Sequence, residues 1–348
     1  MTKLRIGAIS WDCSLPASTY FGFHQIRSMS PAKFRATTPF YADILEEDRI
    51  DYHTRTQEEY DRELQYAIDA GLDYLAHVWY PDEGSRQHVQ TGPNDCSGHV
   101  YELNWARRMH MSSHLKENLH FCAIAGAHPF TDRDLEALAQ GMQDPCYETV
   151  DGRPLLYVIA GCQMDFIGRI RRVCEKLGFA APYIAAMYSN GVEGFAPEHK
   201  QVDALSAYAC WAVGLQRYAQ LSELVMVQNE SRRQAAKHVI PLYTVGWDPS
   251  PRIDHPAPWV QYPDEDYAAL ANRDELLTGA KALADWLQTT AQAQWPGHIL
   301  TFAWNEFEEG GHICPTVGTD GKPNCTRLED FRAVADFFRR ILEETLTT

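Results

Sequence analysis

Three carboxylates lie within four positions, directly after an apolar segment of the chain. The segment reads Thr301-Phe302-Ala303-Trp304-Asn305-Glu306-Phe307-Glu308-Glu309-Gly310-Gly311-His312. Like charges in a partly desolvated pocket raise one another's pKa, so a site can keep one carboxyl protonated as an acid while another stays a base. We therefore expect Glu306 and Glu309 to be catalytic. For Glu308 a solvated acidic loop is an alternative, since acidic residues are commonly exposed.

The elements that must position these carboxylates follow from an alternation along the chain. Short apolar runs rich in β-forming residues alternate with longer amphipathic segments, which is typical of βα units around a parallel sheet. Eight such runs can be counted, at residues 4–11, 74–79, 120–127, 155–160, 183–187, 204–210, 239–245 and 299–304. Eight units predict an α/β fold, a (β/α)8 TIM barrel. Because no repeat, low-complexity tract or Gly/Ser linker interrupts it, we expect residues 1–348 to form a single catalytic domain.

The segments between the runs include well-marked helices and one long loop. Thr56 and Glu59 form a capping box before an apolar stripe that ends at Gly71. Further helices are predicted at residues 97–118, 132–143, 165–177, 213–237, 274–294 and 328–344. The connection after the first run, residues 12–56, is far longer than usual, and such loops are commonly functional. We expect it to cover one side of the site.

In such a barrel the loops that follow the strands build the active site, so the residues at the ends of the runs are candidates. Besides the carboxylates, the candidates are Trp11, Asp12, His77, Trp79, Tyr80, His128, Gln163, Tyr188, Asn190, Tyr208, Trp247, Asp248, Trp304 and Asn305.

A second motif follows the seventh run, and the two motifs together carry a resemblance. Residues 246–252 read Gly-Trp-Asp-Pro-Ser-Pro-Arg, and the last run continues as Trp-Asn-Glu-Phe-Glu-Glu-Gly. The pair resembles the clan around glycoside hydrolase family 99, the endo-α-mannosidases and endomannanases. It is also similar to related proteins of polysaccharide loci that are labelled glycosyltransferases. Weaker similarity runs through residues 6–8, 70–80 and 151–158, so the resemblance extends over most of the chain.

The resemblance implies a (β/α)8 barrel without a metal and with two catalytic carboxylates three positions apart. By this similarity Glu306 would act as the base on the sugar's 2-hydroxyl, giving an epoxide-like intermediate. Glu309 would protonate the leaving oxygen and then activate water, so that the configuration is retained. After Gly310 this sequence departs from the Thr-Gln-Ile-Glu continuation of family 99 and reads Gly-His-Ile-Cys-Pro. The substrate is therefore left open, and family 71 α-1,3-glucanases, with a related motif, invert.

The aromatic residues among the candidates suit a sugar ligand. Trp and Tyr faces stack on the apolar faces of pyranoses while their edges still form hydrogen bonds. Each of these rings could equally belong to the core, which is the competing interpretation. Asp248 and Arg252 could bind sugar hydroxyls or pair with each other, and for Arg252 we favour the pairing.

Metal and nucleotide chemistry find little support in the sequence. His110 and His114 have the spacing of two zinc ligands, but no Glu follows His110 and no third ligand is evident, which favours an exposed helix face. We interpret His77 and His128 as neutral hydrogen-bonding groups near the sugar, with core histidines as the alternative. Neither G-x-G-x-x-G nor G-x-x-x-x-G-K-[ST] occurs. We therefore expect no metal and no cofactor.

Composition limits the partners and the compartment. The chain has 348 residues, with 47 acidic and 31 basic residues, so its net charge of −16 disfavours nucleic acid and anionic membranes. No stretch of about 18 apolar residues is present, which predicts no membrane span. The start lacks a signal-peptide pattern, and nine cysteines occur without a C-x-x-C pair. We expect free thiols and a cytoplasmic location.

The sequence thus favours a glycoside hydrolase that cleaves an α-linked oligosaccharide or glycan by carboxylate acid/base catalysis with retention. One alternative is a glycosyl-transfer enzyme of polysaccharide assembly. Another is a carbohydrate-binding barrel that has lost its chemistry, against which the presence of both Glu306 and Glu309 argues.

Overall fold

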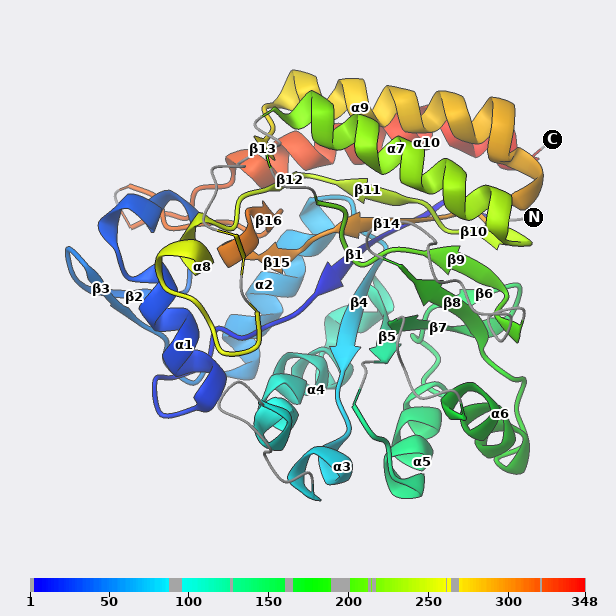
Figure 1. Ribbon diagram of the computed structural model, residues 1–348, viewed down its shortest axis with the longest axis horizontal. Helices are drawn as coiled ribbons and strands as arrows, with labels where there is room; N and C mark the ends of the chain where they lie inside the picture. Colours follow the sequence, from blue (N-terminus) through cyan, green and yellow to red (C-terminus); the bar gives the residue numbers. More distant parts are fainter. Residues whose placement is uncertain are drawn as a thin grey trace.

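The computed structural model shows a curled parallel sheet surrounded by helices (Figure 1). It describes residues 3–87, 96–125, 128–159, 165–188, 201–211, 214, 217–260, 262–263, 269–319 and 321–347. Two of the strand-end candidates, Gln163 and Asn190, lie outside these residues.

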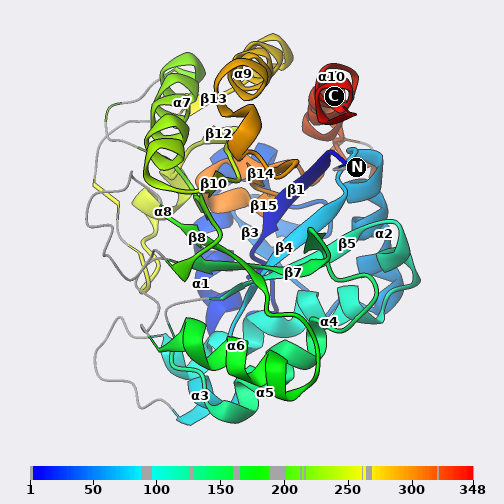
Figure 2. The same cartoon turned by 90° about the vertical axis from the view of Figure 1, so that its right-hand side faces the viewer.

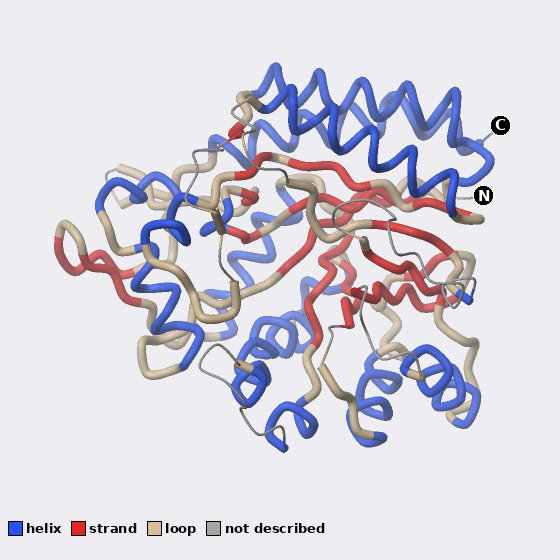
Figure 3. The backbone as a smooth tube through the Cα atoms, viewed as in Figure 1, coloured by secondary structure: helices blue, strands red, loops and turns tan. Residues whose placement is uncertain are grey.

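The strands form a barrel, as the alternation of the sequence predicts. The barrel strands are β1 (Arg5–Ser10), β4 (Tyr74–Trp79), β5 (His120–Ala125), β7 (Arg153–Ile159), β8 (Tyr183–Met187), β9 (Ala204–Ser206), β10 (His238–Val239), β11 (Leu242–Thr244) and β14 (His298–Phe302). Neighbours pair in parallel in the order β10-β9-β8-β7-β5-β4-β1-β14-β11. Figure 3 shows these strands as a central band with the helices outside.

The two ends of this order meet in one stretch of chain. β10 and β11 are separated by Ile240 and Pro241 and correspond to one predicted run. The Ile240 N–H donates to the Leu205 carbonyl at 2.9 Å, and the Leu300 N–H donates to the Pro241 carbonyl at 3.1 Å. Proline has no N–H to give to a ladder, so the strand is interrupted there while its neighbours on both sides stay bonded. The predicted (β/α)8 barrel is confirmed.

Most helices lie where the amphipathic segments predict them; the exceptions are the segment 97–118 and α3 (Asp82–Gln87), which no predicted segment covers. The helices are α2 (Gln57–Asp69), α3, α4 (Trp105–Ser112), α5 (Asp132–Gly141), α6 (Phe166–Lys176), α7 (Tyr218–Ala235), α9 (Arg273–Trp286) and α10 (Thr326–Thr347). The capping box of Thr56 and Glu59 is present at the start of α2. The single helix predicted at residues 97–118 is wrong: 3₁₀ turns at Ser97–Asn104 and His114–Glu117 flank a short α4.

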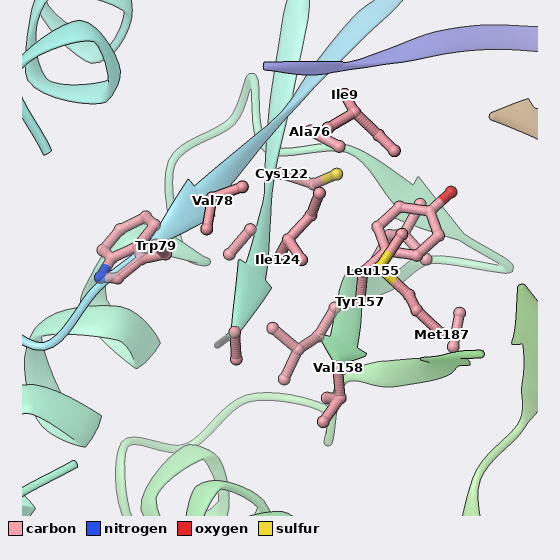
Figure 4. Close-up of a cluster of buried hydrophobic side chains, with 14 of the residues drawn as sticks. Ile9, Ala76, Val78, Trp79, Cys122, Ile124, Leu155, Tyr157, Val158 and Met187 are labelled. Atoms are coloured by element: carbon pink, nitrogen blue, oxygen red, sulfur yellow. The ribbon is translucent and has the colours of Figure 1, made fainter. Parts of the chain in front are cut away.

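The helices cover the barrel on opposite sides. α7, α9 and α10 lie together on one side, and α4, α5 and α6 lie on the other (Figures 1 and 2). The core accordingly has two parts. One cluster lies around β4, β5 and β7 and includes Ile9, Ala76 and Tyr157 (Figure 4). The other packs the sheet against α2, α9 and α10 through residues such as Leu64 and Phe338.

The long connection after β1 is ordered. It contains α1 (Tyr20–Met29), a 3₁₀ helix at Ala32–Thr37 and a hairpin of β2 (Asp43–Glu46) and β3 (Arg49–Asp51) that projects from the barrel (Figure 1). Short strands complete the fold: β6 (Thr149–Val150), β12 (Gly246–Trp247), β13 (Ala269–Leu270), β15 (Asn305–Glu306) and β16 (Gly311–His312).

A buried carboxylate joins three strands at the amino-terminal end of the barrel. Glu148 accepts hydrogen bonds from Arg5 Nε at 2.9 Å, His120 Nδ1 at 3.1 Å and His298 Nε2 at 3.0 Å. These donors stand at the starts of β1, β5 and β14. Burial opposes ionisation of Glu148, but the three donors outweigh it and hold its pKa well below the usual range. Glu148 therefore clamps the end of the barrel opposite the strand-end loops.

Glu148→Gln should lower the free energy of unfolding at pH 7 by about 3 kcal/mol, because it leaves buried donors without their charged partner. The native pKa is depressed, so the stability that the carboxylate provides is complete above its unfolded pKa of about 4.3 and is lost as the pH falls through the native pKa. In urea unfolding, the difference in the free energy of unfolding between the variant and the wild type should thus be constant between pH 7 and 5 and should shrink below about pH 4. Glu136→Gln, on the exposed side of α5, is the control. No difference at pH 7, or one that grows in acid, would contradict the clamp.

Candidate active site

The carboxylates stand on a tight turn just beyond β14. Glu306 ends β15, which pairs with β16 in an antiparallel manner, and Glu308 and Glu309 lie in the 3₁₀ turn between them. Gly310 has a φ of 68°, and a Cβ at this position would lie 2.7 Å from the backbone nitrogen of Asp248. That nitrogen donates to the Glu309 carbonyl at 2.7 Å. Glycine is therefore required here.

Glu306 is buried and has a tyrosine as its partner. The Tyr208 hydroxyl, just after β9, donates to Glu306 Oε1 at 2.5 Å. Burial raises the pKa of Glu306 well above its usual value, and the neighbouring charge of Glu309 raises it further, although the Tyr208 hydrogen bond opposes the shift.

Glu309 is also buried, but it faces a cation as well as a tyrosine. The Tyr262 hydroxyl donates to Glu309 Oε1 at 2.6 Å, and Arg252 Nε lies 3.8 Å from the same oxygen. Burial raises the pKa of Glu309, while Arg252 and Tyr262 act in the opposite direction. Because Glu306 and Glu309 influence each other, they titrate as a pair that keeps a proton to higher pH than an isolated carboxyl would.

Glu308 is a buried member of an ion pair. Arg252 Nη2 donates to Glu308 Oε2 at 2.9 Å, and Ser28 Oγ from α1 donates to the other oxygen. The Cys13 thiol also donates to Glu308, at 3.5 Å. The solvated acidic loop considered for Glu308 is therefore wrong. The buried turn brings its carboxylate inward, where a cation offsets the cost of burial.

The pairing expected between Asp248 and Arg252 is wrong as well. Asp248 Oδ1 accepts the Ser250 N–H at 3.0 Å and the Ser250 hydroxyl at 2.5 Å, so it bonds to the first residue of the short helix α8 (Ser250–Asp254). Arg252, in the same helix, points instead at Glu308.

Several predicted sugar-binding rings lie around this network. Trp11 stands 5.4 Å from the Arg252 guanidinium and donates through Nε1 to the Tyr80 hydroxyl at 3.0 Å. Tyr80 in turn meets the His128 ring edge-on at 5.3 Å. Trp247 meets the Tyr262 ring edge-on at 5.7 Å. Trp11, Tyr80, His128, Tyr208 and Trp247 are thus connected to the carboxylates directly or through neighbouring side chains.

Other candidates face away from the carboxylates. His77 Nε2 bonds to His110 Nδ1 at 2.8 Å, and His110 Nε2 to the Leu119 carbonyl at 2.8 Å. The Trp79 ring packs against Arg107 at 3.6 Å. Side chains two apart on a strand share a face, and on β4 this is the face toward the helices. His77 is therefore a core histidine, which was the alternative to a sugar-binding group. The exposed helix face expected for His110 is wrong, because its side chain is buried.

Asp12, Trp304 and Asn305 form a support beneath the site. Arg55 pairs with both Asp12 and Glu63, and Trp304 Nε1 donates to Glu63 Oε1 at 2.9 Å. Asn305 Oδ1 accepts the Trp11 N–H at 2.9 Å. These residues join both ends of the long connection to the last strand.

Tyr188 packs against Ala186 and Leu205 in a small separate cluster, and its carbonyl accepts a hydrogen bond from Arg232 at 2.6 Å.

Sequence reasoning missed Tyr262, Trp259 and Trp211. Trp259 covers the Arg252 guanidinium at 5.3 Å, and Trp211 stacks on Trp247 with a centroid distance of 6.0 Å. Tyr262 and Trp259 lie within the chain between α8 and β13, well beyond the end of the seventh run. The length of that connection was the available signal, because long loops in compact domains are commonly functional.

The described residues include neither a candidate metal site nor a helix that could span a membrane. No group of three or more His, Cys, Asp or Glu side chains among them is arranged to hold a metal ion. Within the same part of the chain, no helix combines the length and apolar character needed to cross a membrane. Among the cysteines that the structure describes, six are free thiols: Cys13, Cys122, Cys146, Cys174, Cys314 and Cys325.

Comparisons with known proteins place the fold. No family profile matches the sequence, and no curated protein matches it either. Among solved structures, the chain is similar to a family 99 endo-α-mannosidase from Bacteroides thetaiotaomicron in complex with bis-tris propane. The identity is 13% and the TM-score 0.61, over 97% of this chain and 98% of that one. A second structure of the endo-α-mannosidase from this organism gives 14% identity and a TM-score of 0.55, over 85% and 83%. The chain therefore shares the barrel fold of family 99 glycoside hydrolases.

Proposed function

We propose that the protein is a glycoside hydrolase that cleaves an α-linked oligosaccharide or glycan with retention, without a metal, using residues 1–348 as one catalytic domain. The observation that carries the proposal is the buried pair of Glu306 and Glu309, each held by a tyrosine hydroxyl on the loop side of the barrel. In (β/α)8 barrels this is the face where active sites are found. The fold shared with an endo-α-mannosidase supports an α-linked substrate.

Glu306 takes the proton from the sugar's 2-hydroxyl in this proposal, and the freed oxygen attacks the anomeric carbon. The bond to the leaving oxygen breaks as Glu309 protonates that oxygen. Water then attacks the anomeric carbon and gives a proton to Glu309, while the 2-oxygen recovers its proton from Glu306. Both carboxyls return to their starting states, and two inversions at the anomeric carbon give retention.

The proton must reside on Glu309 when this sequence begins. Without substrate, Arg252 and Tyr262 favour the charge on Glu309, whereas Glu306 has only the Tyr208 hydroxyl as a described hydrogen-bond donor. A 2-hydroxyl that donates to Glu306 adds a second hydrogen bond to its carboxylate and lowers its pKa. Substrate binding therefore moves the shared proton toward Glu309.

A binding barrel without chemistry explains the site less well. Burying ionisable groups costs free energy unless each is paired, and Glu306 has no cation within a described ion pair. A buried carboxyl whose pKa is shifted in this way is typical of sites where the protonation state serves a reaction.

The direct test is a screen of aryl α-glycosides and of α-mannan and α-glucan fragments in buffer with EDTA. Proton NMR should show the α-anomer as the first product, since retention is expected, with chelation having no effect. Release of the β-anomer first would contradict retention. Turnover only with a sugar acceptor, not with water, would favour glycosyl transfer instead.

Glu309→Gln should lower turnover of substrates with poor leaving groups by roughly 10²-fold or more and affect activated aryl leaving groups much less, because protonation matters most where the leaving oxygen is basic. The measurement is kcat/KM across a series of aryl leaving groups, with Glu136→Gln as the control. Equal losses across the series would exclude Glu309 as the proton donor.

A 2-deoxy substrate should be nearly inert, and so should the Glu306→Gln variant, because the attack on the anomeric carbon requires the 2-oxygen. The comparison uses matched 2-deoxy and parent glycosides at the same leaving group. Efficient hydrolysis of the 2-deoxy sugar, or an ester trapped on Glu306 by a 2-fluoro sugar, would show direct attack by Glu306 instead.

A further inference from the structure

Arg252 is a buried cation placed unequally between two carboxylates. Its Nη2 donates to Glu308 at 2.9 Å, whereas its Nε lies 3.8 Å from Glu309, beyond hydrogen-bonding distance. Among the described residues Nε and Nη1 have no hydrogen-bond partner, and both atoms are shielded from solvent. The rings of Trp11 and Trp259 lie at 5.4 and 5.3 Å from the guanidinium. The one hydrogen bond of this guanidinium to a carboxylate therefore goes to Glu308.

Glu308 is itself fixed from the other side. Ser28 Oγ donates to Oε1, and Arg252 and Cys13 donate to Oε2. Ser28 belongs to α1 in the long connection after β1, and Cys13 lies at the start of that connection. The long connection thus holds Glu308, and Glu308 holds Arg252.

We propose that Glu308 is a positioning residue, which retains the Arg252 guanidinium and thereby leaves the Glu309 carboxyl free to carry the proton that it donates. The inference rests on the proposed role of Glu309 as the acid. Without Glu308 the unpartnered Nε and Nη1 of Arg252 could bond to Glu309, and a guanidinium at that distance keeps a carboxyl ionised. A carboxylate would then stand where the reaction needs a carboxylic acid.

The electrostatics of the site agree with this geometry. Burial raises the pKa of Glu309, Arg252 and Tyr262 lower it, and the charge of Glu308 raises it. Loss of Glu308 would remove the negative charge that raises the pKa of Glu309. It would also let Arg252 approach Glu309 and lower that pKa further, so both changes lower the pKa of Glu309.

Other titratable groups face these three side chains and enter the design of the test. They are Glu306, Tyr208, Tyr262, Cys13, Tyr52 and His24. Burial raises the pKa of each of the tyrosines and of the Cys13 thiol, so these groups stay neutral near pH 7. Burial and Arg27 lower the pKa of His24, which a His24→Gln background removes from the titration.

The experiment is a carbon-13 NMR titration of protein labelled at the glutamate carboxyls. The Glu309 signal is assigned as the one missing in Glu309→Gln. The variants are Glu308→Gln, Arg252→Gln and the double variant, with Glu136→Gln as a control that also removes one negative charge. This readout needs no substrate.

The single variants should move the Glu309 midpoint in opposite directions. Glu308→Gln should lower it by about one to three pH units, Arg252→Gln should raise it, and the double variant should fall between them. The high-pH limb of kcat/KM for a poor leaving group should shift with the midpoint. Ser28→Ala loosens Glu308 without removing a charge, so it should lower the Glu309 midpoint by a smaller amount. It replaces Glu308→Gln in the test if that variant does not fold.

Unchanged midpoints in Glu308→Gln and Ser28→Ala, or shifts of the same sign in both single charge variants, would overturn the inference. Failure of the proposed function has a different signature. In that case Glu309→Gln would show no selectivity among leaving groups, while the midpoints would still move as stated.

Discussion

Three carboxylates held out of water within a single turn set the requirement that shapes the loop side of the barrel. Each of them needs donors, because a buried charge without partners is costly. Tyr208 from the β9 loop serves Glu306, and Tyr262 from the chain after α8 serves Glu309. Arg252 and Ser28 serve Glu308. Connections after β1, β9 and β11 therefore converge on a few atoms at the end of β14.

The same residue type behaves in opposite ways at the two ends of the barrel. Glu148 is buried among an arginine and two histidines, and its pKa falls. Glu306 and Glu309 are buried with fewer donors and with each other, and theirs rise. Burial alone disfavours the charge in every case, so the number of donors decides the outcome. Glu148 thereby stays ionised at one end of the barrel, while the pair at the other end keeps a proton to higher pH.

The barrel and its carboxylates could be predicted from the sequence, but the direction in which each strand side chain points could not. Central strands of a parallel barrel are apolar on both sides, so the pattern around His77 and Trp79 gives no sign of which face looks inward. Trp304, predicted to end the last strand, lies just beyond β14, which ends at Phe302, and its indole points to Glu63. Tyr262 and Trp259 come from a long connection whose path depends on tertiary contacts rather than on local sequence. Its length indicated a functional loop, but not which of its residues reach the carboxylates.

The support of Asp12, Arg55, Glu63 and Trp304 fixes the long connection only where it leaves and re-enters the barrel. Between those points lies much of its length, including the projecting β2–β3 hairpin. The hairpin can change in length or composition while the barrel beneath it is undisturbed, because Ser28 and Thr38 before it and Arg55 after it hold the connection. Relatives could therefore differ in this hairpin, provided that they keep these contacts.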